Sequence, residues 1–120
     1  MGKNNNIVSV TTHQYHFPSE ILLADSPAAY FEFLNNATMR TGIYTLKAGE
    51  KEMQTPHTED ELYYVLQGKS SMQVGDTKFE VHEGDCVFVP AHLEHRFVDI
   101  IEELKLLVFF SKARVTNEKP

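Results

Sequence analysis

The sequence predicts an all-β domain, folded as an antiparallel sandwich or barrel, on three observations. From Thr41 onward the chain is a series of seven short runs rich in β-forming residues. Glycine supplies backbone shapes that other residues resist, and glycine-containing turns separate the runs at Ala48-Gly49, Gln67-Gly68, Gly75-Asp76 and Glu83-Gly84. Strands that lie this close together and are joined by short turns fold as an antiparallel sheet that closes on itself, which removes open edges.

The seven runs are, in chain order, GIYTLK, LYYVL, SSMQV, KFEV, CVFVP, HRFVDI and ELKLLVFF. We expect a tight hairpin at Gly75-Asp76, between the third and fourth runs. Side chains alternate between the two faces of a strand, so Tyr63 shares a face with Glu61 and is expected to line the interior, while Tyr64 takes the opposite face.

Ahead of the β-rich region we expect a short N-terminal helix over Pro27 to Leu34. Ser26 can cap free amides through its side-chain oxygen, and proline is tolerated at the first position of a helix. The aromatic residues Tyr30 and Phe31 are β-formers, so a strand over the same residues is the alternative.

The length of 120 residues is that of a single domain. We place the domain at residues 7–114, after a disordered N-terminus at residues 1–6 and before a flexible C-terminus at residues 115–120. The beginning of the chain lacks the apolar core of a signal peptide and the single cysteine, Cys86, cannot form an intrachain disulfide, so a cytoplasmic location is expected.

Composition also excludes some partners. The formal net charge is −6 and no cluster of lysine and arginine is present, which argues against nucleic acid as a binding partner. The longest apolar run is LLVFF at residues 106–110, far short of the ~20 residues needed to cross a bilayer, so no membrane span is expected. Neither a glycine-flanked serine elbow nor a glycine-rich phosphate loop occurs, which sets serine-hydrolase and phosphate-loop chemistry aside.

Three histidines lie next to carboxylates in two separate segments. His57 is part of PHTEDE at residues 56–61, while His92 and His95 are part of AHLEH at residues 91–95. Either segment alone is more often a solvated face or a hydrogen-bonded histidine than a site. Imidazole and carboxylate oxygen are nevertheless the ligand types that hold Zn²⁺, Fe²⁺, Mn²⁺ or Ni²⁺.

The spacing of the two segments is more specific. The first follows the pattern G-x5-H-x-H-x3-E-x6-G from Gly49 to Gly68, with Thr55 in place of the first histidine. The second follows G-x5-P-x-G-x2-H-x3-N from Gly84, with His92 at the glycine position and Asp99 at the asparagine position. These are the paired signatures of the cupin superfamily, which the chain resembles at seven of ten signature positions.

The resemblance implies a double-stranded β-helix, a jelly-roll-like antiparallel barrel of six to eight strands, with metal ligands pointing inward from both motifs. The residues at the ligand positions are His57, Glu61 and His95, around a divalent transition metal, either zinc, iron, manganese or nickel. Because Thr55 is a poor donor compared with imidazole, the site is expected to have three protein ligands and more room for water or substrate.

Two functions remain open at this point. One is a metal-dependent enzyme acting on a small molecule, with dioxygenase, decarboxylase or isomerase chemistry, in which Glu59, His92 or Tyr63 moves a proton. The other is a small-ligand binding or sensor module with weak or no metal. In either case the apolar outer face of LYYVL and LLVFF predicts a two-fold homodimer, as the resemblance also does.

Overall fold

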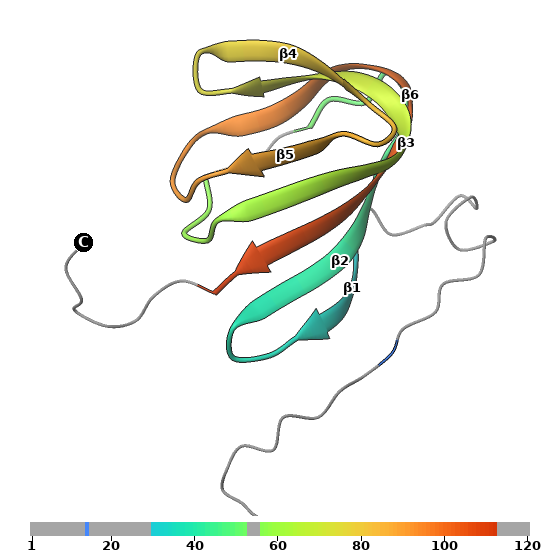
Figure 1. The fold of residues 1–120 in the computed structure, drawn as a ribbon. Helices are drawn as coiled ribbons and strands as arrows, with labels where there is room; N and C mark the ends of the chain where they lie inside the picture. Colours follow the sequence, from blue (N-terminus) through green and yellow to red (C-terminus); the bar gives the residue numbers. More distant parts are fainter. Residues whose placement is uncertain (1–13, 15–29, 53–55, 113–120) are drawn as a thin grey trace, which may run out of the picture.

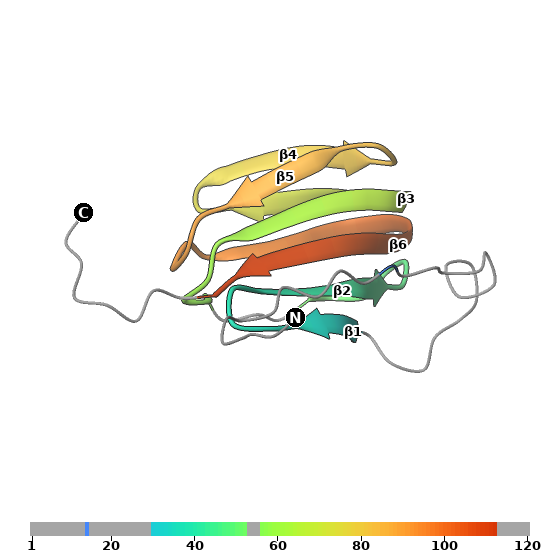
Figure 2. The same cartoon turned by 60° about the horizontal axis from the view of Figure 1, so that its bottom comes forward.

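Six antiparallel strands form one sheet in the computed structural model, which describes residue 14 and residues 30–52 and 56–112. Figure 1 shows β3 and β6 curving together so that the sheet rolls up, and Figure 2 shows the strands stacked from β1 at one edge to β4 and β5 at the other. The predicted all-β fold, a double-stranded β-helix, is confirmed. The strands are β1 (Tyr30–Asn35), β2 (Met39–Leu46), β3 (Glu61–Val74), β4 (Thr77–His82), β5 (Cys86–Val89) and β6 (His95–Ser111).

The sheet is organised around β3 and β6, its two longest strands. The order across the sheet is β1-β2-β6-β3-β4, and β5 also pairs with β3. The first part of β3 pairs with β5 and its last part with β4, while β6 pairs with β3 on one side and with β2 on the other. The pair β3 and β6 therefore runs through both halves of the rolled sheet.

Two of the expected breaks between strands are bends within a strand. LYYVL and SSMQV belong to the single strand β3, and HRFVDI and ELKLLVFF belong to the single strand β6. The glycine at the first break, Gly68, has φ +105°, and the register between β3 and β6 shifts on both sides of it. A Cβ atom on Gly68 would lie 2.2 Å from the carbonyl oxygen of Glu103. Glycine thus lets the backbones approach and the strand bend without ending.

The helix expected over Pro27 to Leu34 is wrong for the part that the structure describes. Residues 27–29 lie outside the described residues, and Tyr30–Asn35 forms strand β1, paired antiparallel with β2. Tyr30 and Phe31 favour a strand, and pairing with β2 satisfies the backbone hydrogen-bonding groups of the segment. A short helix has only marginal stability of its own, so the strand is preferred. The predicted ends at residues 1–6 and 115–120 also lie outside the described residues.

The alternation predicted along β3 is confirmed. Glu61, Tyr63 and Val65 are each 1% exposed, whereas Leu62 is 38% and Tyr64 37% exposed. The inward side chains of β3 join those of β6 and the neighbouring strands in one apolar core, and the site described below lies on this inner face. Among the described residues there is no helix long and apolar enough to cross a membrane.

Backbone conformation explains two departures from the signature pattern. His92 has φ +70° and Asp99 has φ +53°, and these are the non-glycine residues with positive φ in the described chain. They stand at the signature's glycine and asparagine positions, the two residue types that adopt the left-handed conformation most easily. The predicted hairpin at Gly75-Asp76 is confirmed, since Val74 pairs with Thr77 across it.

Candidate metal centre

The rolling of the sheet brings the two signature segments together. Glu61 is the first residue of β3, and His95 is the first residue of β6, where it pairs with Val74 at the far end of β3. In a straight strand of this length, a rise of about 3.3 Å per residue would place the two ends of β3 about 43 Å apart. Instead, Nε2 of His95 lies 3.3 Å from Oε2 of Glu61.

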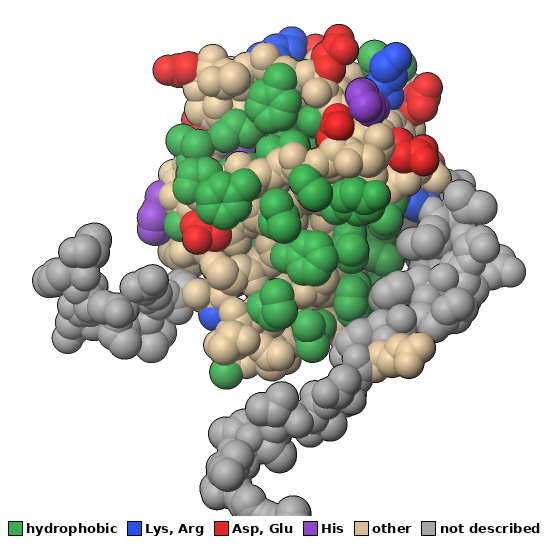
Figure 3. Space-filling view, viewed as in Figure 1, with side chains coloured by type: hydrophobic (Ala, Val, Ile, Leu, Met, Phe, Trp, Pro, Cys, Tyr) green, Lys and Arg blue, Asp and Glu red, His purple; other side chains and the backbone are tan. Residues whose placement is uncertain are grey.

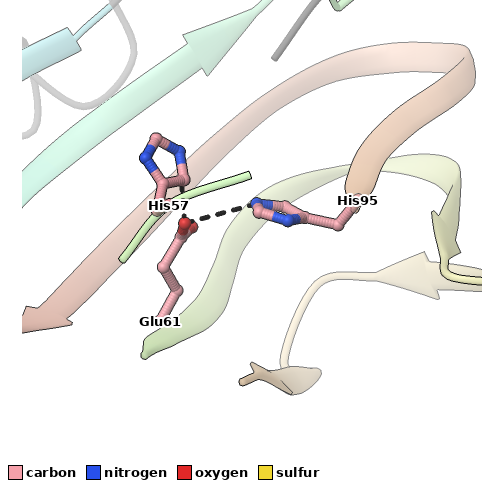
Figure 4. A group of neighbouring side chains, drawn as sticks. All are labelled: His57, Glu61 and His95. Carbon is pink, nitrogen blue, oxygen red and sulfur yellow. Dashed lines mark ion pairs between the residues drawn. The ribbon is translucent and has the colours of Figure 1, made fainter. Parts of the chain in front are cut away.

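His57 completes the cluster from the loop before β3. Its Nε2 lies 3.3 Å from the same Oε2 of Glu61, so the carboxylate sits between two imidazoles, as Figure 4 shows. One ligand atom from each of the three residues lies within 4.8 Å of the others. The side chains of Glu61 and His95 are 1% exposed and that of His57 is 32% exposed, so the cluster is open to solvent on the His57 side.

The buried atoms of this cluster lack hydrogen-bond partners. Both carboxylate oxygens of Glu61 and Nε2 of His95 have none, although Nε2 of His95 and Oε2 of Glu61 lie 3.3 Å apart as an ion pair. The other ring nitrogen of His95, Nδ1, lies 2.9 Å from the carbonyl oxygen of Leu93. A carbonyl only accepts, so Nδ1 carries the proton and Nε2 presents its lone pair to the cluster.

Electrostatics at His95 favours a positive charge in the cluster. Burial by itself lowers the pKa of His95, but the Glu61 carboxylate, the Leu93 carbonyl and the nearby Glu52 outweigh burial, and the net effect raises the pKa above its ordinary value. The negative charge of the nearby carboxylates can be balanced by a protonated imidazole or by a metal cation bound to neutral imidazoles.

The donor set fits a divalent transition metal. Two imidazoles and one carboxylate suit zinc, iron, manganese or nickel, and ligand bonds of about 2.1 Å put neighbouring ligand atoms about 3.4 Å apart in a tetrahedral site. The 3.3 Å separations around Oε2 of Glu61 are close to this spacing. Buried acceptor atoms without partners are costly unless something donates to or coordinates them, which is what a cation would do.

Hydrogen bonds tie the two ligand-bearing segments directly to each other. The backbone N–H of His92 donates to the carbonyl of His57 at 2.7 Å, and the N–H of Ala91 donates to Oδ1 of Asp60 at 2.8 Å. Asp60 is also bound to the end of β6, because its carbonyl accepts the N–H of Ser111 at 3.0 Å. These contacts hold His57 and Glu61 in place relative to His95.

A second support comes from Arg40 on β2. Its Nε and Nη2 donate to the two oxygens of Glu59 at 3.0 and 2.8 Å, and its Nη1 donates to Glu32 on β1 at 3.0 Å. Glu59 lies between His57 and Glu61 in the chain. The bidentate pair therefore fixes the segment that carries two of the three candidate ligands.

Glu52 is a residue that sequence reasoning missed. It is 5% exposed, accepts the backbone N–H of Phe97 at 2.7 Å, and accepts a hydrogen bond from the hydroxyl of Tyr44. It thereby joins the loop before β3 to both β2 and β6. Glu52 occupies an unspecified position of the first signature and has no distinguishing local pattern, so its burial could not be inferred from the sequence.

The three residues expected to move protons lie in different places. Tyr63 is buried beside His95, with ring centroids 6.1 Å apart, and it lines a cavity next to the cluster. Glu59 is held in the ion pair with Arg40. The side chain of His92 is exposed, and Thr55 lies outside the described residues.

Comparison with known protein families gives a match to the cupin domain over residues 42–110, a range that contains both signature segments and all three residues of the cluster. Among curated proteins, an uncharacterized protein of Streptomyces coelicolor, SCO3923, is 41% identical over 88 residues. That alignment covers 73% of this chain and 84% of the relative.

Several solved structures have a fold similar to that of this chain. The protein TT1209 of Thermus thermophilus superposes with a TM-score of 0.68 at 21% identity, covering 82% of this chain and 98% of that protein. The DMSP lyase DddQ of Ruegeria pomeroyi superposes with a TM-score of 0.59 at 21% identity, covering 66% of this chain and 41% of the lyase.

Proposed function

This chain belongs to the cupin domain family, and we propose that it binds one divalent transition-metal ion through His57, Glu61 and His95 and acts on a small molecule inside the barrel. The observation that carries the proposal is the trio of buried acceptor atoms without partners, two on Glu61 and one on His95. One ligand atom of Glu61 on β3 lies within 4.8 Å of one of His95 on β6 and of one of His57, which a coordinated cation explains and apolar packing does not.

The residues have distinct parts in this proposal. Glu61 supplies the negative charge, and His95 supplies a lone pair whose direction is set by the bond from Nδ1 to the Leu93 carbonyl. His57, which is partly exposed, stands at the side from which a small molecule would enter. A bound divalent metal would leave positions open to polarise a carbonyl or carboxylate oxygen. Tyr63 lines the adjoining cavity and is the proposed proton-moving group of the three expected ones.

A fold shared with solved structures does not choose among dioxygenase, decarboxylase and isomerase chemistry. DddQ is named a lyase that acts on DMSP, but a likeness at 21% identity supports the fold alone. The binding-only alternative uses the same site, so the decisive first experiment is metal binding, which the enzymatic role requires.

The experiment is a calorimetric titration of Zn²⁺, Mn²⁺, Ni²⁺ and, without oxygen, Fe²⁺ into protein prepared without a histidine tag and stripped with EDTA. We expect one site for at least one of these metals, weakened at least about a hundredfold in His95→Ala and Glu61→Gln. His82→Ala is the matched control, because His82 is the last residue of β4, has a 65% exposed side chain and should leave the affinity unchanged. A wild type that binds no metal, or equal losses in all three variants, would overturn the proposal.

We also propose that two copies of the chain pair through the outer face of the sheet. Phe88 on β5, Leu62 on β3 and Phe109 on β6 are neighbours across three strands, and Phe88 is 58% exposed. Figure 3 shows hydrophobic side chains gathered over this face. An uncharged apolar patch is complementary to itself. Light scattering should give twice the 13.7 kDa chain mass, and a monomer at micromolar concentration would contradict the pairing.

A further inference from the structure

A cavity of about 270 Å³ opens beside the cluster of His57, Glu61 and His95, and its walls are mainly aromatic. Its size lies just under the range of about 300–1,000 Å³ that is usual for small-molecule sites, so its occupant must be small. His57 belongs to both the cavity wall and the cluster, so an occupant would reach the proposed metal. The aromatic members of the wall are Tyr30, Tyr44, Tyr63 and Phe110.

The rings of the wall hold one another in place. Tyr30 packs edge to face against Tyr44 at 6.4 Å and against Phe110 at 6.2 Å between centroids. Phe110 in turn packs edge to face against His57 at 5.8 Å. Rings fixed at such angles offer faces and edges to a flat guest, an arrangement that favours aromatic over saturated groups of the same size.

The hydroxyls of two wall tyrosines already donate within the protein. That of Tyr30 donates to Glu32 at 3.0 Å, and that of Tyr44 donates to Glu52. Burial and the Glu32 carboxylate raise the pKa of the Tyr30 phenol, so it stays neutral at physiological pH. A ligand oxygen that needs a donor would find these two hydroxyl protons already used, and burying it there without a partner would be costly.

Two carboxylates of the protein already outweigh the positive charge of Arg40. Its guanidinium lies 4.1 Å from the centroid of Phe110 and pairs with both Glu59 and Glu32. One positive and two negative charges leave this part of the cavity with a net negative charge. A carboxylate directed here would be repelled, whereas a carboxylate directed at a metal held by the cluster would be attracted.

We propose that the cavity selects a small planar molecule, aromatic or conjugated, that carries one acidic oxygen group at its metal end and none at its Arg40 end. This inference rests on the proposed function, because the metal holds the acidic group. Dicarboxylates are disfavoured by the net negative charge around Arg40, and sugars are disfavoured by the occupied hydroxyls.

The test compares four probes by calorimetry on protein loaded with the metal that binds best. Benzoate is planar with one carboxylate, cyclohexanecarboxylate has the same size without planarity, terephthalate adds a second carboxylate, and galacturonate is a sugar acid. We expect benzoate to bind about 3- to 10-fold more tightly than cyclohexanecarboxylate and at least about tenfold more tightly than the other two. Equal affinities, or a preference for terephthalate or galacturonate, would overturn the inference.

Two variants connect the preference to the residues named. Tyr30→Leu should remove most of the preference for benzoate over cyclohexanecarboxylate, while the control Phe31→Leu, at its outward-facing neighbour on β1 with 47% exposure, should not. Glu32→Gln makes the Arg40 group neutral overall and should raise terephthalate affinity about 3- to 10-fold with little change for benzoate. If these variants bind metal as the wild type does but show none of these effects, the inference fails while the proposed function stands. If the wild type binds no metal, the proposed function fails first.

Discussion

Replacing Glu61 by leucine should stabilise the metal-free protein. Its carboxylate is 1% exposed and both oxygens lack hydrogen-bond partners, so folding removes them from water without replacing the bonds that water made. Leaving a buried polar group unsatisfied costs about 1–3 kcal/mol, and an apolar side chain of similar size avoids that cost. At roughly 4 °C per kcal/mol, Glu61→Leu should raise the melting temperature by about 4–12 °C in EDTA at pH 8.5.

Adding metal should make the wild type more stable than Glu61→Leu. A ligand that binds only the folded state, present at a hundred times its dissociation constant, stabilises by about 2.7 kcal/mol. The wild type should gain this increment and Glu61→Leu should not, so the curves measured with and without metal should cross. Differential scanning fluorimetry in EDTA and in metal, followed by urea denaturation at 25 °C, measures both differences.

Glu52→Leu is the matched control, because Glu52 is a buried carboxylate whose oxygens are satisfied. Removing it leaves the N–H of Phe97 and the hydroxyl of Tyr44 without their acceptor, at about 1–3 kcal/mol each. It should therefore destabilise the protein with and without metal. If Glu61→Leu in EDTA instead falls below the wild type by more than about 1 kcal/mol, Glu61 is a structural partner of the two histidines and the argument for a cation is refuted.

Three further predictions concern the bend, the pH response and the turn before β6. Gly68→Ala should lower the free energy of unfolding by more than about 2 kcal/mol, because the new Cβ would meet the Glu103 carbonyl at 2.2 Å. The control Gly84→Ala, at φ +95° with open space around the new Cβ, should lower the free energy of unfolding by only about 1 kcal/mol. Equal losses for the two variants in urea titrations would exclude the close approach to Glu103 as the cause. Because the pKa of His95 is raised in the folded state, its protonation stabilises the metal-free protein below about pH 6.5, and this stabilisation is lost as the pH rises through the folded pKa. Metal binding instead requires the neutral imidazole of His95. The melting-temperature increment on adding metal should therefore grow from pH 5.5 to pH 8, and a flat increment would argue against histidine ligation. His92→Gly should stabilise the fold by about 1 kcal/mol by relieving a residue at φ +70° and should keep full metal affinity; a lost affinity would assign the His92 side chain to the site.

Features that depend on local spacing could be predicted from the sequence. Alternation along a strand is a local property, so the inward direction of Glu61 and Tyr63 and the outward direction of Tyr64 followed from their positions. The spacing of the two signatures, one from Gly49 to Gly68 and one beginning at Gly84, was enough to indicate the family. The positive φ values at His92 and Asp99 show why substitutions at two signature positions did not obscure the match.

How distant parts of the chain meet depended on tertiary contacts. Gly68 could be a turn or a bend by local criteria, and the pairing of β3 with β6 on both sides of it made it a bend. That bend brings His95 from the far end of β3 to 3.3 Å from Glu61. Tyr30 became part of a strand because β2 was there to pair with it. Non-local hydrogen bonding and packing set these arrangements, and no window of sequence contains both partners.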